Sequence, residues 1–164
     1  PFDQRAFRGA LGRFATGVTI VTTVDADGAR YGVTANSYNS VSLDPPLVLW
    51  SLARSSRSLP AFAASGAFAV HVLSAEQEAL ALRFAGRGAQ DKFAGIEAGA
   101  GVGGVPLLPG CAAHFECTTH ACVDGGDHVI FLGRVVHFAR SDTAPLVFHD
   151  GRFVRVGPPP PLLL

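Results

Sequence analysis

The sequence has no excess of charge of either sign. Thirteen Lys and Arg residues balance thirteen Asp and Glu residues over 164 positions, so the formal net charge is zero. Without a basic balance or a basic run, the chain offers no long-range attraction to nucleic acid or to an anionic membrane. We therefore expect no nucleic acid and no membrane among its partners.

The sequence also has no long apolar run and few cysteines. Its apolar runs are far shorter than the roughly 20 residues that a membrane-spanning helix needs, and no signal peptide is visible at its start. The three cysteines lie within residues 111–122. An odd number so closely spaced is not a disulfide framework, which favours a reducing, cytoplasmic location.

Several catalytic motifs are missing. There is no G-x-S-x-G nucleophile elbow and no Walker A loop. Residues 99–104 satisfy G-x-G-x-x-G, but no strand precedes them, and Pro106 and Pro109 prevent the helix that would meet a pyrophosphate. A flexible loop is the better interpretation of these glycines.

Residues 114–122 contain two histidines, a glutamate and two cysteines. In a strand, His114, Glu116, His120 and Cys122 would point to one face and Cys117 to the other. The segment has no C-x-x-C, and the four close ligands of a structural zinc site are not gathered. We therefore expect no metal site and interpret the segment as a half-exposed strand with ordinary polar residues.

What the sequence does contain predicts one mainly β domain over residues 1–157 and a proline-rich, poorly ordered tail over 158–164. It is 48% hydrophobic and 16% charged, enough to build a core. β-Branched and alternating patterns predict long strands at 18–24, 31–42, 47–52, 68–73, 112–123 and 128–139, and short closing strands at 145–148 and 153–156. Helices are expected near 3–16, 59–64 and 74–84, with a loop over 94–110. Many strands with short turns predict an antiparallel barrel with peripheral helices.

Three segments carry side chains suited to binding a ligand. Thr34, Asn36 and Ser37 are small polar residues within an otherwise apolar strand. Small side chains let a flat ring approach the backbone, and their polar groups can bond its edge. The alternative is that these residues simply face water.

The second segment, residues 51–58, brings four serines and two arginines to the start of a helix. Free N–H groups and guanidinium groups both favour an anion, so this is a plausible phosphate site. The alternative is ordinary capping by one serine beside two solvated arginines. Lys92 and Phe93 add a point charge next to an aromatic ring.

The third segment begins at His128, where a turn passes into a strand. A histidine there is usually a surface residue, but it can also offer a planar face and a hydrogen bond to a ligand at the mouth of a barrel.

In this order and spacing, these segments resemble the flavin reductase family with the FMN-binding split-barrel fold, which includes the small reductase components of two-component flavin monooxygenases. The resemblance covers nearly the whole chain. It rests on the segments 34–37, 40–42, 45–48, 84–86, 91–93 and 126–128, together with the serine-rich loop before the second helix.

The resemblance implies an antiparallel split β-barrel and a set of flavin-binding residues. The ring and ribityl chain would lie along Thr34, Ala35, Asn36, Ser37, Ser42, Ser51, Leu52 and Ala53. Ser56, Arg57 and Ser58 would hold the phosphate, Lys92 and Phe93 would complete the site, and His128 would lie near the nicotinamide as the catalytic residue.

The activity implied is an NAD(P)H:flavin oxidoreductase that reduces FMN or FAD with NADH or NADPH and supplies a partner flavin-dependent monooxygenase. Hydride transfer between two stacked rings needs no acid–base residue, which fits the absence of a triad. A homodimer is also expected. Two alternatives stay open: a non-catalytic flavin-binding split barrel used in storage, sensing or electron transfer, and a split barrel that handles heme or pyridoxamine.

Overall fold

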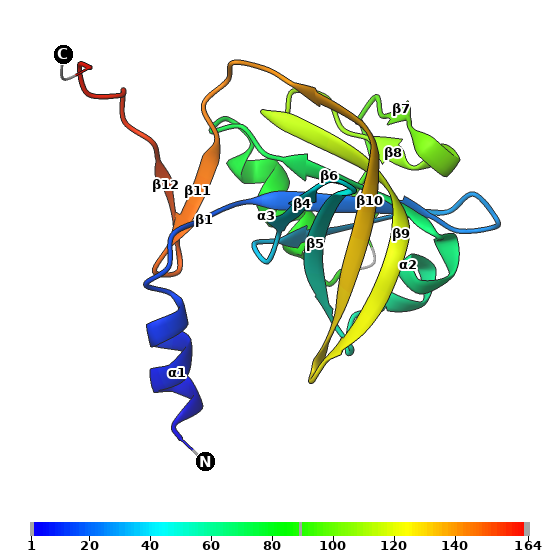
Figure 1. The fold of residues 1–164 in the computed structure, drawn as a ribbon, viewed down its shortest axis with the longest axis horizontal. Helices are drawn as coiled ribbons and strands as arrows, with labels where there is room; N and C mark the ends of the chain where they lie inside the picture. The colour runs from blue at the N-terminus through cyan, green and yellow to red at the C-terminus, as the bar shows by residue number, and fades with distance from the viewer. Residues whose placement is uncertain (1, 89, 163–164) are drawn as a thin grey trace.

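The computed structural model describes residues 2–88 and 90–162, and antiparallel strands dominate it (Figure 1). The central sheet has seven strands in the order β3-β2-β6-β9-β10-β5-β4. Their bounds are β2 Thr19–Val24, β3 Arg30–Ala35, β4 Asn39–Leu43, β5 Pro46–Ala53, β6 Ala67–Val72, β9 Ala113–Gly125 and β10 His128–Arg140. The expectation of a mainly β, antiparallel fold of the flavin reductase type with peripheral helices is confirmed.

Alternation along β5 fixes which side chains form the main core. Val48, Trp50 and Leu52 are buried, while the residues between them are only half-buried, as the period of two in a strand requires. The ring of Trp50 stacks on Phe131 of β10 with centroids 5.1 Å apart. Because β5 and β10 pair antiparallel, this packing holds the strand whose end opens into the site described below.

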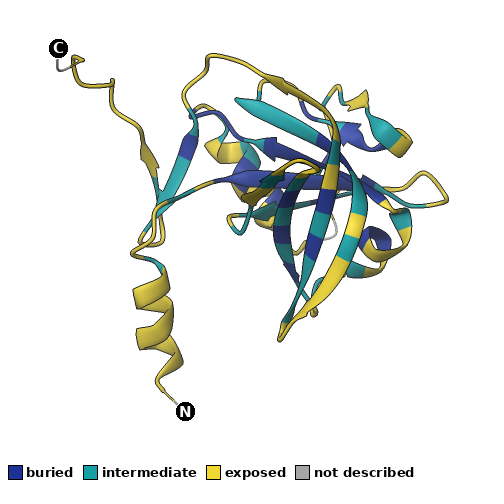
Figure 2. Ribbon diagram, in the orientation of Figure 1, coloured by how far each residue is buried: buried dark blue, intermediate teal, exposed yellow. Residues whose placement is uncertain are grey.

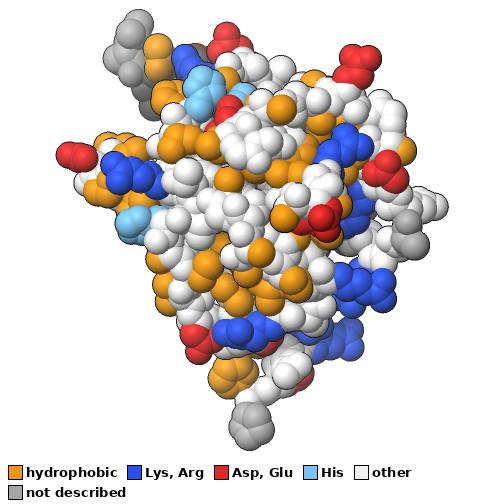
Figure 3. Space-filling view, turned by 90° about the vertical axis from the view of Figure 1, so that its right-hand side faces the viewer, with side chains coloured by type: hydrophobic (Ala, Val, Ile, Leu, Met, Phe, Trp, Pro, Cys, Tyr) orange, Lys and Arg blue, Asp and Glu red, His pale blue; other side chains and the backbone are white. Residues whose placement is uncertain are grey.

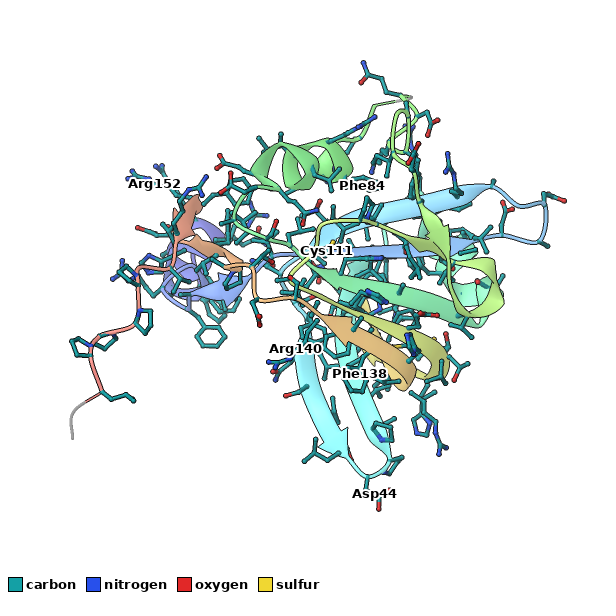
Figure 4. The ribbon with its side chains drawn as sticks, turned by 90° about the horizontal axis from the view of Figure 1, so that it is seen from above. Asp44, Phe84, Cys111, Phe138, Arg140 and Arg152 are labelled. Atoms are coloured by element: carbon teal, nitrogen blue, oxygen red, sulfur yellow. The ribbon has the colours of Figure 1, made fainter. Side chains whose placement is uncertain are left out.

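Helices α2 (Leu59–Ser65) and α3 (Glu78–Ala85) pack against the sheet. Phe84 of α3 is 1% exposed and lies so close to β3 that a Cβ on Gly32 would fall 2.4 Å from its ring. Figure 4 shows this phenylalanine beneath its helix, facing the strands. Only glycine at position 32 leaves room for that ring, and α3 is thereby seated directly on β3.

A second buried connection lies at His71 of β6. Its Nε2 accepts a hydrogen bond from the Leu108 N–H at 3.1 Å, so Nδ1 carries the proton and donates to the Ile20 carbonyl at 3.0 Å. Burial lowers the pKa of this imidazole to about 4, which keeps it neutral and satisfied inside the fold.

Small sheets flank the main one. β1 (Thr16–Gly17), β11 (Leu146–His149) and β12 (Arg152–Arg155) form a three-stranded sheet. Residues 94–110 were expected to be loop throughout, but they contain the two-stranded pair β7 (Gly99–Ala100) and β8 (Pro106–Leu107) around the short 3-10 helix η1 (Val102–Gly104). The glycine-rich run therefore forms a tight turn and opens no α-helix.

Three predicted elements have different limits. The opening helix, expected near 3–16, covers only Gln4–Leu11. The strand expected over 31–42 is broken between Ala35 and Asn39, and its two halves form opposite edges of the seven-stranded sheet. The helix expected from residue 74 begins at Glu78, because the Gln77 side chain turns back and accepts a hydrogen bond from the Ser74 N–H at 2.9 Å.

The N-terminal helix α1 (Gln4–Leu11) projects away from the sheet, and none of its residues is buried (Figures 1 and 2). Asp3 caps it through a 2.8 Å bond from the Arg5 N–H. Phe7 and Leu11, which share one face of this helix, are 47% and 58% exposed. Residues 156–162, after β12, also extend from the body.

Charge is unevenly distributed although the net charge is zero. On the face shown in Figure 3, basic side chains are concentrated toward the right-hand side. Among the described helices, none has the length and apolar character needed to cross a bilayer.

Candidate functional site

A pocket of about 520 Å³ opens beside the central sheet. It lies where β3, the loop after β5 and the C-terminal end of α3 meet. Its walls are formed by Val33, Thr34, Leu52, Ala53, Ser55, Ser56, Arg57, Ser58, Phe84, Ala85, Gly86, Arg87, Gly88 and Lys92. A smaller hollow of about 260 Å³ shares Ser58, Gly88 and Lys92 with it and is bordered by Phe93.

The β3 wall contains Thr34 as predicted, but part of its hydroxyl is already used. Thr34 Oγ1 donates to the Ala81 carbonyl of α3 at 2.6 Å. This bond holds the helix against the strand and leaves the oxygen lone pairs free to accept from a ligand. Thr34 therefore lines the pocket and also holds α3 against β3.

The residues after Thr34 leave the pocket lining. Ser37 joins the end of β3 to β5, accepting from the Ser51 N–H at 2.8 Å and donating to the Ser51 carbonyl at 3.2 Å. Ala35 packs partly against the main core, and Asn36 is exposed. Ser42 lies in β4, paired with Leu47 at the far edge of the sheet.

The predicted phosphate segment lies in the pocket wall, with Ser56, Arg57 and Ser58 together. Ser58 is the N-cap position of α2, yet its side chain makes no capping bond. The Ser56 hydroxyl accepts instead from the Ser58 N–H at 3.3 Å. Simple serine capping therefore does not account for this segment, and the Arg57 side chain lies exposed at the pocket.

Lys92 reaches into the same region from the other side. Its ammonium donates to the carbonyls of Phe84 at 2.8 Å and Gly32 at 3.2 Å, and partial burial lowers its pKa from the ordinary value. Phe93 is 3% exposed, packs edge-on against Phe84 and borders only the smaller hollow. Lys92 therefore fixes the corner between β3 and α3 with a charge directed at the pocket.

Sequence reasoning missed the stretch after α3 as a source of pocket-lining residues. Gly86, Arg87 and Gly88 all line the pocket. A cation between two glycines directly after a helix was the available signal, since glycine lets a backbone approach a ligand closely. Only the segment 84–86 had been noted, and only as part of a resemblance.

The pocket is positively charged. Arg57, Arg87 and Lys92 line it, and no carboxylate is found among the described lining residues. Three cations in this lining, in a chain of zero net charge, form a site that favours an anionic ligand, and the carboxylate of Asp91 borders only the smaller hollow. Leu52, Val33 and Phe84 supply an apolar wall beside them.

His128 lies next to the pocket but does not line it. It is the first residue of β10 and pairs with the wall residue Ala53. Its Nδ1 lies 2.7 Å from Asp127 Oδ1, and this hydrogen bond lowers the pKa of the Asp127 carboxyl. If Nδ1 donates to that carboxylate, Nε2 remains available to a ligand.

Arg54 connects the turn that carries His128 to the pocket loop. Its backbone N–H donates to the Asp127 carbonyl at 2.9 Å, and its Nε donates to the Gly126 carbonyl at 2.8 Å. The guanidinium also pairs with Asp124. The hairpin between β9 and β10 is thereby fixed beside the loop that contains Ser55 to Ser58.

Known proteins are similar to this chain both in sequence and in fold. The sequence profile of the flavin reductase like domain matches residues 11–157. The chain is 48% identical over 153 residues to FMN reductase (NADH) SmoA of Agrobacterium fabrum, covering 93% of this chain and 86% of that protein. It is 43% identical over 157 residues to the flavin-dependent monooxygenase reductase subunit HsaB of Rhodococcus jostii, covering 95% and 80%.

A solved structure agrees with these matches. The NADH:FAD oxidoreductase SgcE6 of Streptomyces globisporus, in complex with NAD and FAD fragments, superposes with a TM-score of 0.90 at 40% identity, covering 95% of this chain and 94% of that one. Some relatives are longer, and the chain spans only 49% of one of them. The profile match and these identities show that the chain belongs to the flavin reductase like family.

Proposed function

We propose that this chain is an NAD(P)H:flavin oxidoreductase that reduces FMN or FAD and supplies the reduced flavin to a flavin-dependent monooxygenase. The observation that carries the proposal is the pocket itself, where three cations face an apolar wall. A flavin nucleotide has the same two halves, a flat apolar ring and an anionic phosphate. The names of the relatives SmoA and HsaB point to the same activity.

The residues present fit a flavin. Phosphate would be held by Arg57, Ser56 and Ser58, with Arg87 as a second cation. The ring would lie against Leu52 and Ala53, which are small or apolar and therefore leave room for a flat group. The pocket of about 520 Å³ lies within the range of ligand sites. Lys92 would add charge where the two hollows join.

The remaining predicted residues would act from beside the ring. Ser37 and Ser51 would support the wall through their mutual hydrogen bonds, and Ala35 and Asn36 directly follow the wall residue Thr34 in the sequence. Ser42 lies farthest from the pocket, and its assignment rests on the resemblance alone.

When bound, the flavin supplies the hydride-accepting chemistry that protein side chains lack. The chain's own task is to hold the two rings in contact and keep them aligned. His128 would place its ring beside the nicotinamide, with Asp127 fixing its orientation. No side-chain nucleophile is required, and burial raises the pKa of Cys117 to about 12 and that of Cys111 to about 11.

A second copy of the chain would complete the molecule. An eight-residue helix is marginal on its own in water, yet α1 buries none of its residues and exposes Phe7 and Leu11. We expect a homodimer in which the partner covers this face. Clefts between subunits are also a common location for ligand sites.

The test compares turnover with binding. The purified chain is mixed anaerobically with FMN or FAD and with NADH or NADPH, and nicotinamide oxidation is followed. A flavin reductase consumes nicotinamide only when flavin is present. A flavin-binding protein without turnover would bind flavin and oxidise none, and a heme or pyridoxamine protein would show a different absorption spectrum.

A further inference from the structure

Three potential metal ligands meet outside the pocket. His114 and Glu116 lie on β9 and His137 lies on β10, and one ligand atom from each lies within 4.8 Å of the others. None of the three lines either hollow described above. The cluster is therefore separate from the flavin site.

An irregularity in β10 brings His137 to this position. The register runs from Val135 opposite Cys117 directly to His137 opposite Glu116, so Val136 is an extra residue in the strand. A β-bulge of this kind re-aims the side chains beside it. Without the extra residue, Val136 would stand opposite Glu116 and the third ligand would be lost.

One nitrogen of the cluster is buried and lacks a hydrogen-bond partner among the described residues. His114 Nε2 is fully buried and has no hydrogen-bond partner within residues 2–88 and 90–162. It lies 3.7 Å from Glu116 Oε1, too far for a hydrogen bond. Leaving a buried nitrogen unsatisfied costs free energy, so an unpaired group of this kind calls for an unseen partner.

The Glu116 carboxylate is fixed in position by burial and by a backbone hydrogen bond. It is 7% exposed, and its Oε2 accepts from the Val102 N–H at 2.7 Å. Gly101 lets η1 pass this close, because a Cβ there would fall 2.7 Å from the same oxygen. One carboxylate oxygen is therefore oriented by the backbone, while Oε1 lies 3.7 Å from His114 Nε2. This is the arrangement of a metal ligand with its supporting hydrogen bond.

We propose that His114, Glu116 and His137 bind one divalent transition-metal ion, with Zn²⁺ as the fitting probe. Two imidazoles and one carboxylate suit a borderline ion, whereas Mg²⁺ and Ca²⁺ prefer oxygen ligands. Ligand atoms around a tetrahedral zinc lie roughly 3.3 Å apart, so only a small closure is needed. His137 is exposed and free to supply it. The bound ion joins β9 to β10 and, through Glu116, to η1.

Isothermal titration of the chelator-treated protein with ZnCl₂ tests the proposal. Wild type is expected to bind one Zn²⁺ per chain, and Mg²⁺ should not compete. His137→Ala removes an exposed ligand without disturbing the core, and affinity should fall at least about tenfold, since even outer-shell changes have effects of that size. Glu116→Gln should weaken binding while keeping an oxygen for the Val102 N–H. The thermal midpoint should rise with Zn²⁺ in wild type and not in His137→Ala.

His120→Ala is the matched control, because His120 is an exposed histidine of the same strand outside the cluster. Its affinity for Zn²⁺ should equal that of wild type. Absence of Zn²⁺ binding in wild type would overturn the proposal, and so would binding that survives His137→Ala or is lost in His120→Ala. Flavin reduction by the metal-free protein is expected to continue, so failure here leaves the proposed function standing.

Discussion

Arg57 is the side chain whose loss should separate phosphate binding from ring binding. It lines the pocket beside Ser56 and Ser58. Losing a charge-assisted bond costs about 1.5–3 kcal/mol, so Arg57→Ala should weaken FMN or FAD roughly ten- to a hundredfold and leave riboflavin nearly unchanged. Fluorescence titration with all three flavins measures this.

The control for that variant is Arg155→Ala. Arg155 pairs with Glu76 on the surface and lies outside the lining. The Arg155→Ala variant should bind FMN, FAD and riboflavin as wild type does. Equal losses for FMN, FAD and riboflavin in Arg57→Ala would contradict the phosphate assignment.

His128 should affect the nicotinamide step and not flavin affinity. It is next to the wall residue Ala53 but is oriented by Asp127. His128→Ala should raise KM for NADH or slow flavin reduction in stopped-flow measurements, with flavin Kd little changed. The same hydrogen bond also fits a histidine that only steadies Asp127. Wild-type reduction rates at every NADH concentration would favour that role.

For single residues, the sequence predicted which residue types line the pocket better than it predicted which residues would be their neighbours in space. Thr34 was identified because a polar side chain interrupts an apolar strand, and Ser56 and Arg57 because serines and arginines gather before the start of a helix. Arg87 was missed because its place in the pocket depends on where α3 ends. His137 was missed as a neighbour of Glu116 because strand alternation along β9 says nothing about a bulge in β10.

Among the helices and strands, the packing of α3 against β3 forms one side of the pocket. Gly32→Ala would drive a methyl group into the Phe84 ring, where no space exists. Overpacking of this kind typically costs about 1–3 kcal/mol. We expect a lower thermal midpoint by calorimetry and weaker flavin binding, because Phe84 and Lys92 both belong to this corner.

Two further variants test whether the close contact between position 32 and Phe84 causes the expected loss of stability. Gly17→Ala should cost little, because nothing lies within 4 Å of a Cβ there. Combining Gly32→Ala with Phe84→Leu should recover part of the lost stability by making space. If Gly32→Ala is as stable as wild type, the close contact does not position α3.

Element limits were predictable where local chemistry decides them and not where pairing does. The hairpin turn at residues 25–28 and the strands on either side follow from Asp, Gly and β-branched residues. The break between β3 and β4 does not, because it arises from the two halves reaching opposite edges of the sheet, with Ser37 bonded to Ser51. Pairing between strands that are distant in the sequence has no local sequence signal.

At the scale of the whole molecule, exposed apolar surface on α1 predicts a dimer. Light scattering at micromolar concentration should give twice the chain mass. Phe7→Glu places a charge on that face and should shift the protein toward monomer, while Leu162→Glu in the tail should not. Wild type that is monomeric under these conditions would defeat the homodimer.

We propose that this chain transfers a hydride from a nicotinamide to a flavin held in the cationic pocket. Anaerobic stopped-flow mixing of the flavin-loaded protein with NADH, or with NADH deuterated at the transferred position, tests it most directly. We expect the visible absorption of the oxidised flavin to be lost in a single turnover, and to be lost more slowly with the deuterated nicotinamide. Flavin that stays oxidised in the presence of excess NADH and NADPH would contradict it.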